Sequence, residues 1–494
     1  MSTPDPVKSQ NTPKAAKEAA PRPEKAGPGE RQNHRKAAKQ FLDSPEHAAS
    51  HDTRVWAMRE RRDAAMETIE EWEELRDLAS QIKTHALTHL DEYLEQFADN
   101  AAANGVHVHW ASDAADHNRI VHEIFKDHGV QKVIKSKSML MEECGFRHYM
   151  EGVGIDIVET DLGERIQQLD AEDPSHVVVP SVHKMRSDVA QVFSETIGSD
   201  PDNDDAYYLT EQQRQHTRPL ILDADAGMTG ANFAVAETGG FVVCTNEGNA
   251  DLSANVPNLH VASIGIEKIV PKLSDMGVFI RLLSRSALGS PITQYTSHFR
   301  APKQDGEMHI VLVDNGRSKR LGEDRFWSSL KCIRCGACMN TCPVFRRSGG
   351  LSYGATYTGP LGLILDPSID AYRYSNLPFA STLNGSCTNV CPVKINIHEQ
   401  IFEWRRVLAE DDQIPWTKRK SLAAAGEVLA SPRAYRTAVK SAHSALKHLP
   451  DWTIYNKLNA WGQVRDFPDV PAEGTFHDWY RKHRLKTSDT AGQA

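Results

Sequence analysis

The sequence of 494 residues contains no long run of apolar residues. A transmembrane helix needs about 20 consecutive, mostly apolar residues, and no stretch here approaches that length. The N-terminus also lacks the apolar core of a secretory signal peptide and has no twin-arginine signal. We therefore expect no membrane-spanning helix and predict a cytoplasmic location.

The sequence also lacks an excess of basic residues. It has 57 Lys and Arg against 66 Asp and Glu, which gives a formal net charge of −9. Nucleic-acid-binding proteins usually present a basic surface, so we expect no such partner. The sequence also lacks the G-x-G-x-x-G dinucleotide fingerprint and the G-x4-G-K-[ST] phosphate loop. Oxidising a hydroxy acid removes two electrons, usually through flavin or nicotinamide. These absences favour a relay between redox centres over a complete dehydrogenase.

Cysteine is nearly confined to one segment, which holds six of the eight cysteines. The first run has the spacing C-x2-C-x2-C-x3-C-P and contains Cys332, Cys335, Cys338, Cys342 and Pro343. A second run repeats the C-x3-C-P ending with Cys387, Cys391 and Pro392. This spacing is typical of ferredoxins, in which the fourth cysteine of each run serves the other cluster. Cys391 is therefore predicted to complete the [4Fe–4S] cluster that Cys332, Cys335 and Cys338 begin.

Two other uses of cysteine fit less well. Structural zinc sites rarely use three cysteines at two-residue gaps followed by C-x3-C-P. A disulfide framework is not expected in a chain of this length without a signal peptide. Cys144 and Cys244 stand alone in apolar surroundings, so we interpret both as small core residues.

The second cluster departs from the two-cluster pattern. Cysteines would be expected three and six residues before Cys387, where the chain has Asn384 and Ser381. Only Cys342 and Cys387 remain as thiolates for a cluster that normally takes four. An oxygen ligand, water, a three-iron cluster or an empty site all remain open.

The composition divides the chain into five parts. Residues 1–40 are rich in proline and basic residues, so we predict a disordered extension. The following parts are a helical segment (41–104), an α/β domain (105–318), the iron–sulfur module (319–403) and a helical C-terminal region (404–494). The α/β class follows from apolar runs alternating with helical windows. The runs are Val106–Trp110, Lys132–Ile134, Ile155–Val158, His176–Val179, Leu220–Leu222, Phe241–Val243 and His309–Val313.

Parallel sheets bind ligands beyond the carboxyl ends of their strands. Three loops rich in carboxylates and glycine are predicted there: Glu159–Glu164, Asp223–Gly230 and Thr245–Asn249. They favour a small-molecule site at the rim, although any one of them could simply cap a helix. His107 and His109 share a strand face, but no third metal ligand is near them in the sequence, so we interpret them as exposed or hydrogen-bonded.

Two further features leave alternatives open. Arg346 and Arg347 follow Cys342 and could balance a cluster, meet a partner or face solvent. Aromatic residues in an amphipathic tail usually pack on the parent fold, with a subunit interface as the alternative. The tryptophans of the C-terminal region are Trp404, Trp416, Trp452, Trp461 and Trp479.

Many segments, in order, resemble the lactate utilization protein B family, over roughly residues 50–480. They include Lys135–Met139, Glu159–Glu164, Pro174–Pro180, Gly230–Gly239, Asn246–Asn249, Gly265–Pro271, Pro291–Ser297 and Cys391–Ile395. The stretch Leu140–His148 differs from the sequence that is usual in the family.

The resemblance implies a LUD-type domain with the CoA-transferase and sugar-isomerase superfold, followed by a two-cluster ferredoxin-type module. It implies cluster one on Cys332, Cys335, Cys338 and Cys391, and cluster two on Cys342, Cys387 and a cysteine at the position of Asn384. It also implies oxidation of L-lactate to pyruvate together with partner subunits of the A and C types.

Our leading hypothesis is an iron–sulfur electron-transfer subunit of a cytoplasmic lactate-oxidising complex, a subunit of an oxidoreductase rather than a complete enzyme. The alternatives are an iron–sulfur sensor or scaffold, and an acyl transferase with a structural cluster. For the latter, Glu247 in Asn-Glu-Gly-Asn is the position that resembles the nucleophile loop of CoA transferases. No catalytic residue follows from the sequence.

Overall fold

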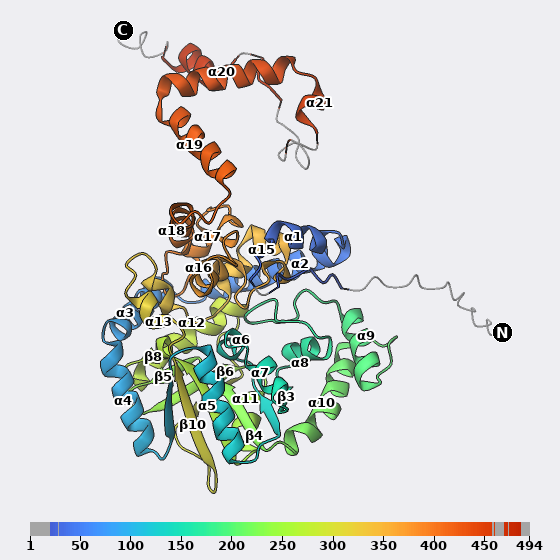
Figure 1. Cartoon of the computed structure of the whole chain (residues 1–494), viewed down its shortest axis with the longest axis vertical. Coiled ribbons are helices and arrows are strands. Elements are labelled where there is room, and N and C mark those ends of the chain that lie inside the picture. Colours follow the sequence, from blue (N-terminus) through green and yellow to red (C-terminus); the bar gives the residue numbers. More distant parts are fainter. Residues whose placement is uncertain (1–19, 28, 457–458, 460–468, 473, 486–494) are drawn as a thin grey trace, which may run out of the picture. The chain divides into compact units, whose positions relative to one another are not determined.

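The computed structural model describes residues 20–27, 29–456, 459, 469–472 and 474–485 (Figure 1). The chain divides into two compact units, residues 1–413 and 414–494. No helix in the described ranges is long and apolar enough to cross a membrane.

A six-stranded parallel sheet forms the centre of the first unit. Its strands, in spatial order, are β1 (His107–Ala111), β10 (Glu307–Val313), β7 (Leu259–Gly265), β4 (Ala226–Gly230), β2 (Lys132–Lys135) and β3 (Asp156–Glu159). Every neighbouring pair is parallel, so all carboxyl ends lie at one edge. Parallel pairing requires crossovers and two covered faces, which explains why the strands read as buried apolar runs.

Both faces of this sheet are covered. Side chains alternate along each strand, so Val261 and Val311 face one layer while Ile264 and Ile310 face the other. The first layer contains α5 (Ala114–Asp127), α6 (Met139–Glu143) and α7 (Phe146–Gly152). The second contains α4 (Leu90–Ala103) and a smaller sheet.

The smaller sheet has the order β8 (Ile269–Val270), β5 (Phe233–Val235), β6 (Gly240–Thr245) and β9 (Tyr295–Phe299). Strands β5 and β6 are antiparallel and joined by a tight turn, in which Gly239 has a φ of 64°. A side chain at Gly239 would collide with the backbone of Ala101 in α4, so the turn packs directly on that helix.

Further helices flank the sheet. Around one side lie α8 (Leu162–Leu169), α9 (Arg186–Ile197) and α10 (Ala206–Leu222), which share a small apolar cluster. The remaining elements near the sheet are α11 (Asn249–Asn255), η1 (Ile266–Lys268), η2 (Leu273–Asp275), α12 (Met276–Leu288) and α13 (Arg317–Leu321).

The cysteine-bearing module consists of short helices that gather at one end of the sheet in Figure 1. They are η3 (Trp327–Lys331), α14 (Ala337–Asn340), α15 (Pro343–Ser348), η4 (Leu351–Tyr353), α16 (Gly359–Ile369), η5 (Leu377–Phe379), α17 (Ser386–Asn389) and α18 (Ile397–Glu410). Three N-terminal helices pack against this module or beside the sheet: α1 (His34–Leu42), α2 (Pro45–Met66) and α3 (Trp72–Thr88). The module is therefore packed from segments that come both before and after the α/β domain in the sequence.

The second unit contains α19 (Trp416–Ala430), α20 (Pro432–His448), α21 (Asp451–Ile454), α22 (Phe476–Tyr480) and a short π-helical turn (Arg481–Leu485). Neither α19 nor α20 has a buried residue. Trp416 and Trp452 are exposed, Trp404 of α18 is buried against Phe326, and Trp461 lies outside the described residues.

The α/β class, the parallel sheet and the helical C-terminus are as predicted, but two predicted strands are wrong. His176–Val179 is a bent segment in which the His176 ring accepts the backbone N–H groups of Val178 and Val179. Leu220–Leu222 ends α10, despite Pro219 within that helix. Short apolar runs do not distinguish buried strands from buried turns or helix ends.

The prediction of disorder for residues 1–40 is also wrong in part. Residues 1–19 lie outside the described residues, but α1 begins at His34 and buries Ala37 and Phe41. Gln32 is buried as well, and its backbone N–H donates to the carbonyl of Arg373. Composition averaged over forty residues concealed this short docking segment.

Candidate iron–sulfur centre and adjoining pocket

The cysteines of the module converge in one space. Burial raises the pKa of Cys338, and the nearby thiols of Cys335, Cys332, Cys387 and Cys391 raise it further. A cationic group would reverse this effect, because metal binding deprotonates its thiol ligands. Backbone N–H groups already point at the sulfurs, from Arg334 to Cys332 (3.3 Å) and from Ile395 to Cys391 (3.4 Å). These features fit a thiolate-bound cluster.

The thiols do not show the close spacing of a tetrahedral zinc site. Tetrahedral zinc has Zn–S bonds of about 2.3 Å and so holds its thiolates less than about 4 Å apart. In the described part of the chain, the group of metal-binding side chains whose ligand atoms all lie within 4.8 Å of one another contains no cysteine. The ligand set of Cys332, Cys335, Cys338 and Cys391 stays a prediction that this geometry supports.

The second site has two thiols and does not fit four-cysteine ligation. Burial raises the pKa of the Cys387 thiol to about 12, and the nearby thiol of Cys342 raises it further. Asn384 is exposed, and its Oδ1 accepts hydrogen bonds from the Ser386 N–H (3.1 Å) and hydroxyl (3.0 Å). Ser381 accepts the N–H of Leu383. Both replacement residues are therefore engaged within their own turn.

Arginines from the N-terminal helices hold the cysteine loops, a contribution that sequence spacing did not reveal. Arg76 of α3 donates to the carbonyl of Cys391 (2.8 and 3.1 Å) and to that of Asn389 (2.7 Å). Arg62 of α2 donates to the carbonyl of Val390 (3.3 Å). Both side chains are buried. In the sequence, the signal that could have identified them is an arginine at a position on the apolar face of a helix, where charged residues are rare.

A pocket of about 230 Å³ lies between the carboxyl edge of the sheet and the cysteine module. Its lining includes Gly230 and Gly265, at the ends of β4 and β7, and Cys335 and Arg334 of the first cysteine run. Gly265 is required there, because a Cβ at this position would lie 2.2 Å from the Glu267 carboxylate. Thus the edge predicted to bind a ligand meets the predicted cluster.

Buried ion pairs form the inner wall of the pocket. Arg317 binds Glu267 through Nε (2.5 Å) and Glu143 through both terminal nitrogens (2.9 Å each). Arg334 lies 3.7 Å from Glu267 and stacks on the ring of Tyr357 at 4.5 Å. One terminal nitrogen of Arg334, Nη1, is buried without a hydrogen-bond partner.

Two titratable groups of the pocket have shifted pKa values. Burial lowers the pKa of Lys268 to about 8, although Glu267 and Cys332 oppose the shift. At the mouth, partial desolvation and the Asp161 carboxylate raise the pKa of Glu247 to about 7. The Glu247 carboxylate accepts the backbone N–H of Leu162 at 3.2 Å.

The predicted rim loops are brought together only in part. Asp161 and Glu247 both line the pocket. Glu159 and Glu164 instead surround the fully buried Lys135. Asp225 lies at the opposite edge of the sheet, because it precedes β4 and accepts the N–H groups at the start of β2. The prediction for the Asp223–Asp225 part of its loop was therefore wrong, since the preceding segment is a helix.

The other predicted residues also have defined positions. Cys144 is buried in the core as expected, whereas Cys244 is half-buried and lines the pocket. Arg346 pairs with Asp52 (2.7 Å) and stacks on Trp56 at 4.2 Å, so its partners belong to α2.

Comparison with known proteins finds three families along the chain. The LUD domain family matches residues 94–320, the 4Fe-4S dicluster domain family matches 328–395, and the family "Lactate utilisation protein B, C-terminal" matches 407–485. Lactate utilization protein B 2 of Bacillus mycoides (strain KBAB4) is 39% identical over 447 residues, covering 88% of this chain and 93% of that protein. The chain belongs to the lactate utilization protein B family.

Other members give the same result. Lactate utilization protein B of Bacillus cytotoxicus (strain DSM 22905 / CIP 110041 / 391-98 / NVH 391-98) is 39% identical, again over 88% of this chain and 93% of the relative. A crystal structure of a DUF162 family protein from Deinococcus radiodurans is 14% identical and covers 45% of this chain and 98% of that chain, with a TM-score of 0.25. Membership of the lactate utilization protein B family and the dicluster domain establish a 4Fe–4S cofactor for this chain.

Proposed function

We propose that this protein is the iron–sulfur electron-transfer subunit of a cytoplasmic complex that oxidises L-lactate to pyruvate. The single observation that carries the proposal is the pocket at the sheet edge, which is lined by Cys335. A molecule in this pocket would lie beside a predicted cluster ligand. Bound at these cysteines, a [4Fe–4S] cluster supplies one-electron transfer.

The residues of the chain support a relay in three ways. The cysteines are held by backbone N–H groups and by arginines from two helices, which keeps the centre rigid. The inner wall excludes water through buried ion pairs. The pocket is open to a small molecule, but its volume is below the ~300–1,000 Å³ typical of sites for drug-sized ligands, so it favours a small acid over an acyl-CoA.

Partner subunits of the A and C types are part of the proposal. Lactate oxidation releases two electrons, whereas each cluster carries one, so further redox centres must receive them. The exposed aromatic side chains of the second unit, among them Trp416 and Trp452, are of the kind enriched at subunit interfaces.

Replacing Cys335 with alanine tests the proposal. We expect this variant to lose lactate-dependent growth and lactate oxidation, because its first cluster lacks a ligand. Cys144→Ala, which removes a core thiol outside the module, is the control and should retain both. Lactate oxidation at the wild-type rate by Cys335→Ala would exclude the electron-transfer role and favour a sensor or scaffold.

A further inference from the structure

The inner end of the pocket has a surplus of positive charge. Arg317 already binds the carboxylates of both Glu143 and Glu267. Arg334 has the longer contact to Glu267, donates to the Tyr357 hydroxyl (3.4 Å) and stacks on that ring, but its Nη1 is buried without a partner. Lys268 is half-buried and, within the described residues, makes no hydrogen bond or ion pair, although the Glu267 carboxylate and the Cys332 thiol lie near enough to favour its charged form. A buried cationic nitrogen without a partner is costly, so the pocket is suited to an anion.

The rest of the lining restricts what this anion can be. A volume of about 230 Å³ corresponds to roughly seven or eight water molecules, which suits a short acid. Neutral hydrogen-bonding side chains line the pocket beside the cations, among them Ser263, Asn232 and Thr245. Glu247 adds a carboxylate at the mouth. A ligand with a carboxylate next to a hydroxyl or keto oxygen would satisfy both kinds of group.

We propose that this pocket binds small 2-hydroxy and 2-oxo acids, with Lys268 and Arg334 receiving the carboxylate and the neutral polar lining, such as Ser263, facing the neighbouring oxygen. The inference rests on the proposed function and places its substrate and product in this subunit. Charge-assisted hydrogen bonds to a carboxylate are roughly twice as strong as neutral ones. The two cations therefore provide affinity, and the polar lining selects for the 2-oxygen.

Calorimetric titration of the anaerobically prepared holoprotein tests the inference. L-lactate, pyruvate, propionate and inorganic phosphate are the probes, because propionate lacks the 2-oxygen and phosphate reports on any anion site. The variants are Lys268→Met and, as control, Lys126→Met, which changes an exposed lysine of α5. Iron content and the reduced-cluster EPR signal are recorded for each variant, so that a lost cluster is distinguished from a lost ligand site.

We expect lactate and pyruvate to bind at least tenfold more tightly than propionate. Lys268→Met should weaken both by tenfold or more, with iron and EPR signal unchanged, while Lys126→Met binds normally. Undiminished binding by Lys268→Met, or no binding to the wild type, would overturn the inference while the relay function stands. Equal affinity for propionate or phosphate would also contradict the inference, because the pocket would then bind anions without selecting for the 2-oxygen.

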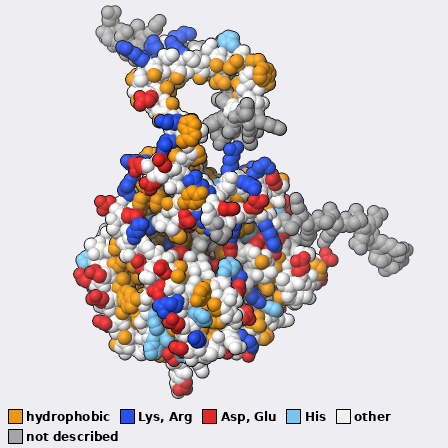
Figure 2. Space-filling view, in the orientation of Figure 1, with side chains coloured by type: hydrophobic (Ala, Val, Ile, Leu, Met, Phe, Trp, Pro, Cys, Tyr) orange, Lys and Arg blue, Asp and Glu red, His pale blue; other side chains and the backbone are white. Residues whose placement is uncertain are grey.

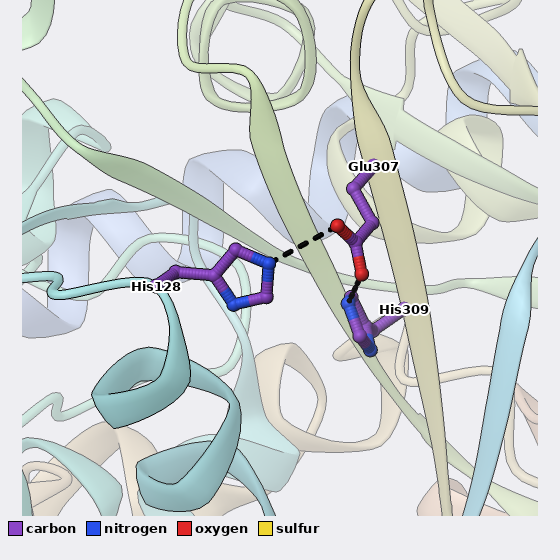
Figure 3. A group of neighbouring side chains, drawn as sticks. All are labelled: His128, Glu307 and His309. Atoms are coloured by element: carbon purple, nitrogen blue, oxygen red, sulfur yellow. Dashed lines mark hydrogen bonds and ion pairs between the residues drawn. The ribbon is translucent and has the colours of Figure 1, made fainter.

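A second site stands on independent observations at the opposite edge of the sheet. Glu307 begins β10, and its carboxylate contacts His128 Nε2 (3.0 Å) and His309 Nε2 (2.8 Å), as Figure 3 shows. The ligand atoms of these three residues all lie within 4.8 Å of one another. His107 Nε2 is 3.5 Å from the same carboxylate, because β1 pairs with β10 so that His107 lies opposite His309.

His107 is exposed and His109 is hydrogen-bonded to His309, as the sequence-based interpretation expected. What the sequence did not reveal is that His128, at the end of α5, and Glu307 and His309 of β10 lie next to His107. Figure 2 shows histidine side chains exposed on the lower part of the face that it presents.

The outer contacts of these rings suit metal ligands. His128 Nδ1 donates to the carbonyl of Ile124 at 2.8 Å, and His309 Nδ1 lies 2.9 Å from His109 Nε2. Bonds of this kind fix the tautomer that presents Nε2 to a metal ion. With Nδ1 of His128 protonated, its Nε2 lone pair faces a carboxylate oxygen, so a proton or a metal ion must lie between them.

We infer that His128, His309 and Glu307 form a binding site for a divalent transition metal such as zinc, with His107, near the same carboxylate, able to add a fourth ligand by moving closer. Imidazole and carboxylate are ordinary zinc ligands, with bonds of about 2.0–2.2 Å, and the ligand atoms of the first three residues already lie within 4.8 Å of one another. The bound ion would join the end of α5 to β1 and β10.

Zinc titration of the cluster-loaded protein tests this site, with His128→Ala as variant and His122→Ala, on the same helix, as control. One zinc ion per chain with micromolar or tighter affinity, weakened at least tenfold in His128→Ala only, is the expected result. Unchanged iron content would show that zinc has not entered the cysteine site. No zinc binding, or equal binding by His128→Ala, would contradict the metal site and show that His128 and Glu307 form a protonated ion pair instead.

Discussion

The surroundings of single residues at the pocket could be predicted only in part from the sequence around them. Asn-Glu-Gly-Asn identified Glu247, and the structure places it at the pocket mouth beside Asp161. Nothing in the sequence marked Lys268, because its importance comes from lacking a partner. A residue's type can be read from the chain, but the charges around it depend on segments brought together by folding.

The raised pKa of Glu247 predicts a pH-dependent effect on stability. A carboxyl group whose pKa is higher in the folded than in the unfolded protein costs stability once it ionises. This cost grows from about pH 4.5 to about pH 7 and is constant above. We expect Glu247→Gln to raise the thermal midpoint at pH 8 by roughly 1 °C, but not at pH 4.5.

Thermal scans at both pH values measure this difference, with Glu74→Gln, an exposed carboxylate of α3, as the control. A gain for Glu247→Gln that is the same at both pH values would show that its carboxyl group does not titrate as described.

At the scale of elements, the N-terminal helices support the iron–sulfur loops. Helices α2 and α3 precede the α/β domain by sequence, yet Arg62 and Arg76 bind carbonyls beside Cys391. Residues 41–104 were predicted to be helical, and Trp72 and Phe97 within them are buried. Leu78 is 44% exposed although it is apolar, because the buried face of α3 runs through Leu75, Ala79, Lys83 and Ala86 and leaves Leu78 outside it.

Replacing Arg76 should loosen the second cysteine run. Arg76→Met removes the hydrogen bonds of its guanidinium to the carbonyls of Cys391 and Asn389, while the Cys391 carbonyl keeps the N–H of Lys394; each lost hydrogen bond contributes about 0.5–1.5 kcal/mol. We expect a lower thermal midpoint and faster loss of iron to a chelator. An iron-loss rate and midpoint equal to those of Glu74→Gln would show that these hydrogen bonds do not hold the loop.

At the scale of the whole molecule, the spacing of cysteines and the short apolar runs were sufficient for much of the architecture. β1, β2, β3, β6 and β10 were predicted, and a pocket lies at the sheet edge where a ligand site was predicted. The meeting of that edge with Cys335 was not, because it depends on contacts such as the one between His176 and Asn340 (3.0 Å). Local patterns predict elements and ligand spacing, whereas the docking of module on sheet arises from residues distant in the sequence.

The missing cysteine at position 384 predicts the metal content of the whole chain. Anaerobically prepared protein should contain about four irons and show one reduced-cluster EPR signal, because the Asn384 side chain is exposed and bonded to Ser386. Asn384→Cys supplies a third thiol for the second site and should increase the iron content. Seven or eight irons in the wild type would show that oxygen ligands suffice.

Lactate-driven reduction of the cluster tests the central claim most directly. The oxidised protein is mixed anaerobically with its A- and C-type partner subunits and L-lactate, then frozen within a turnover for EPR. We predict a reduced-cluster signal that forms at least as fast as pyruvate appears and is missing in Cys335→Ala. Pyruvate formation at the full rate while the cluster stays oxidised would contradict the account.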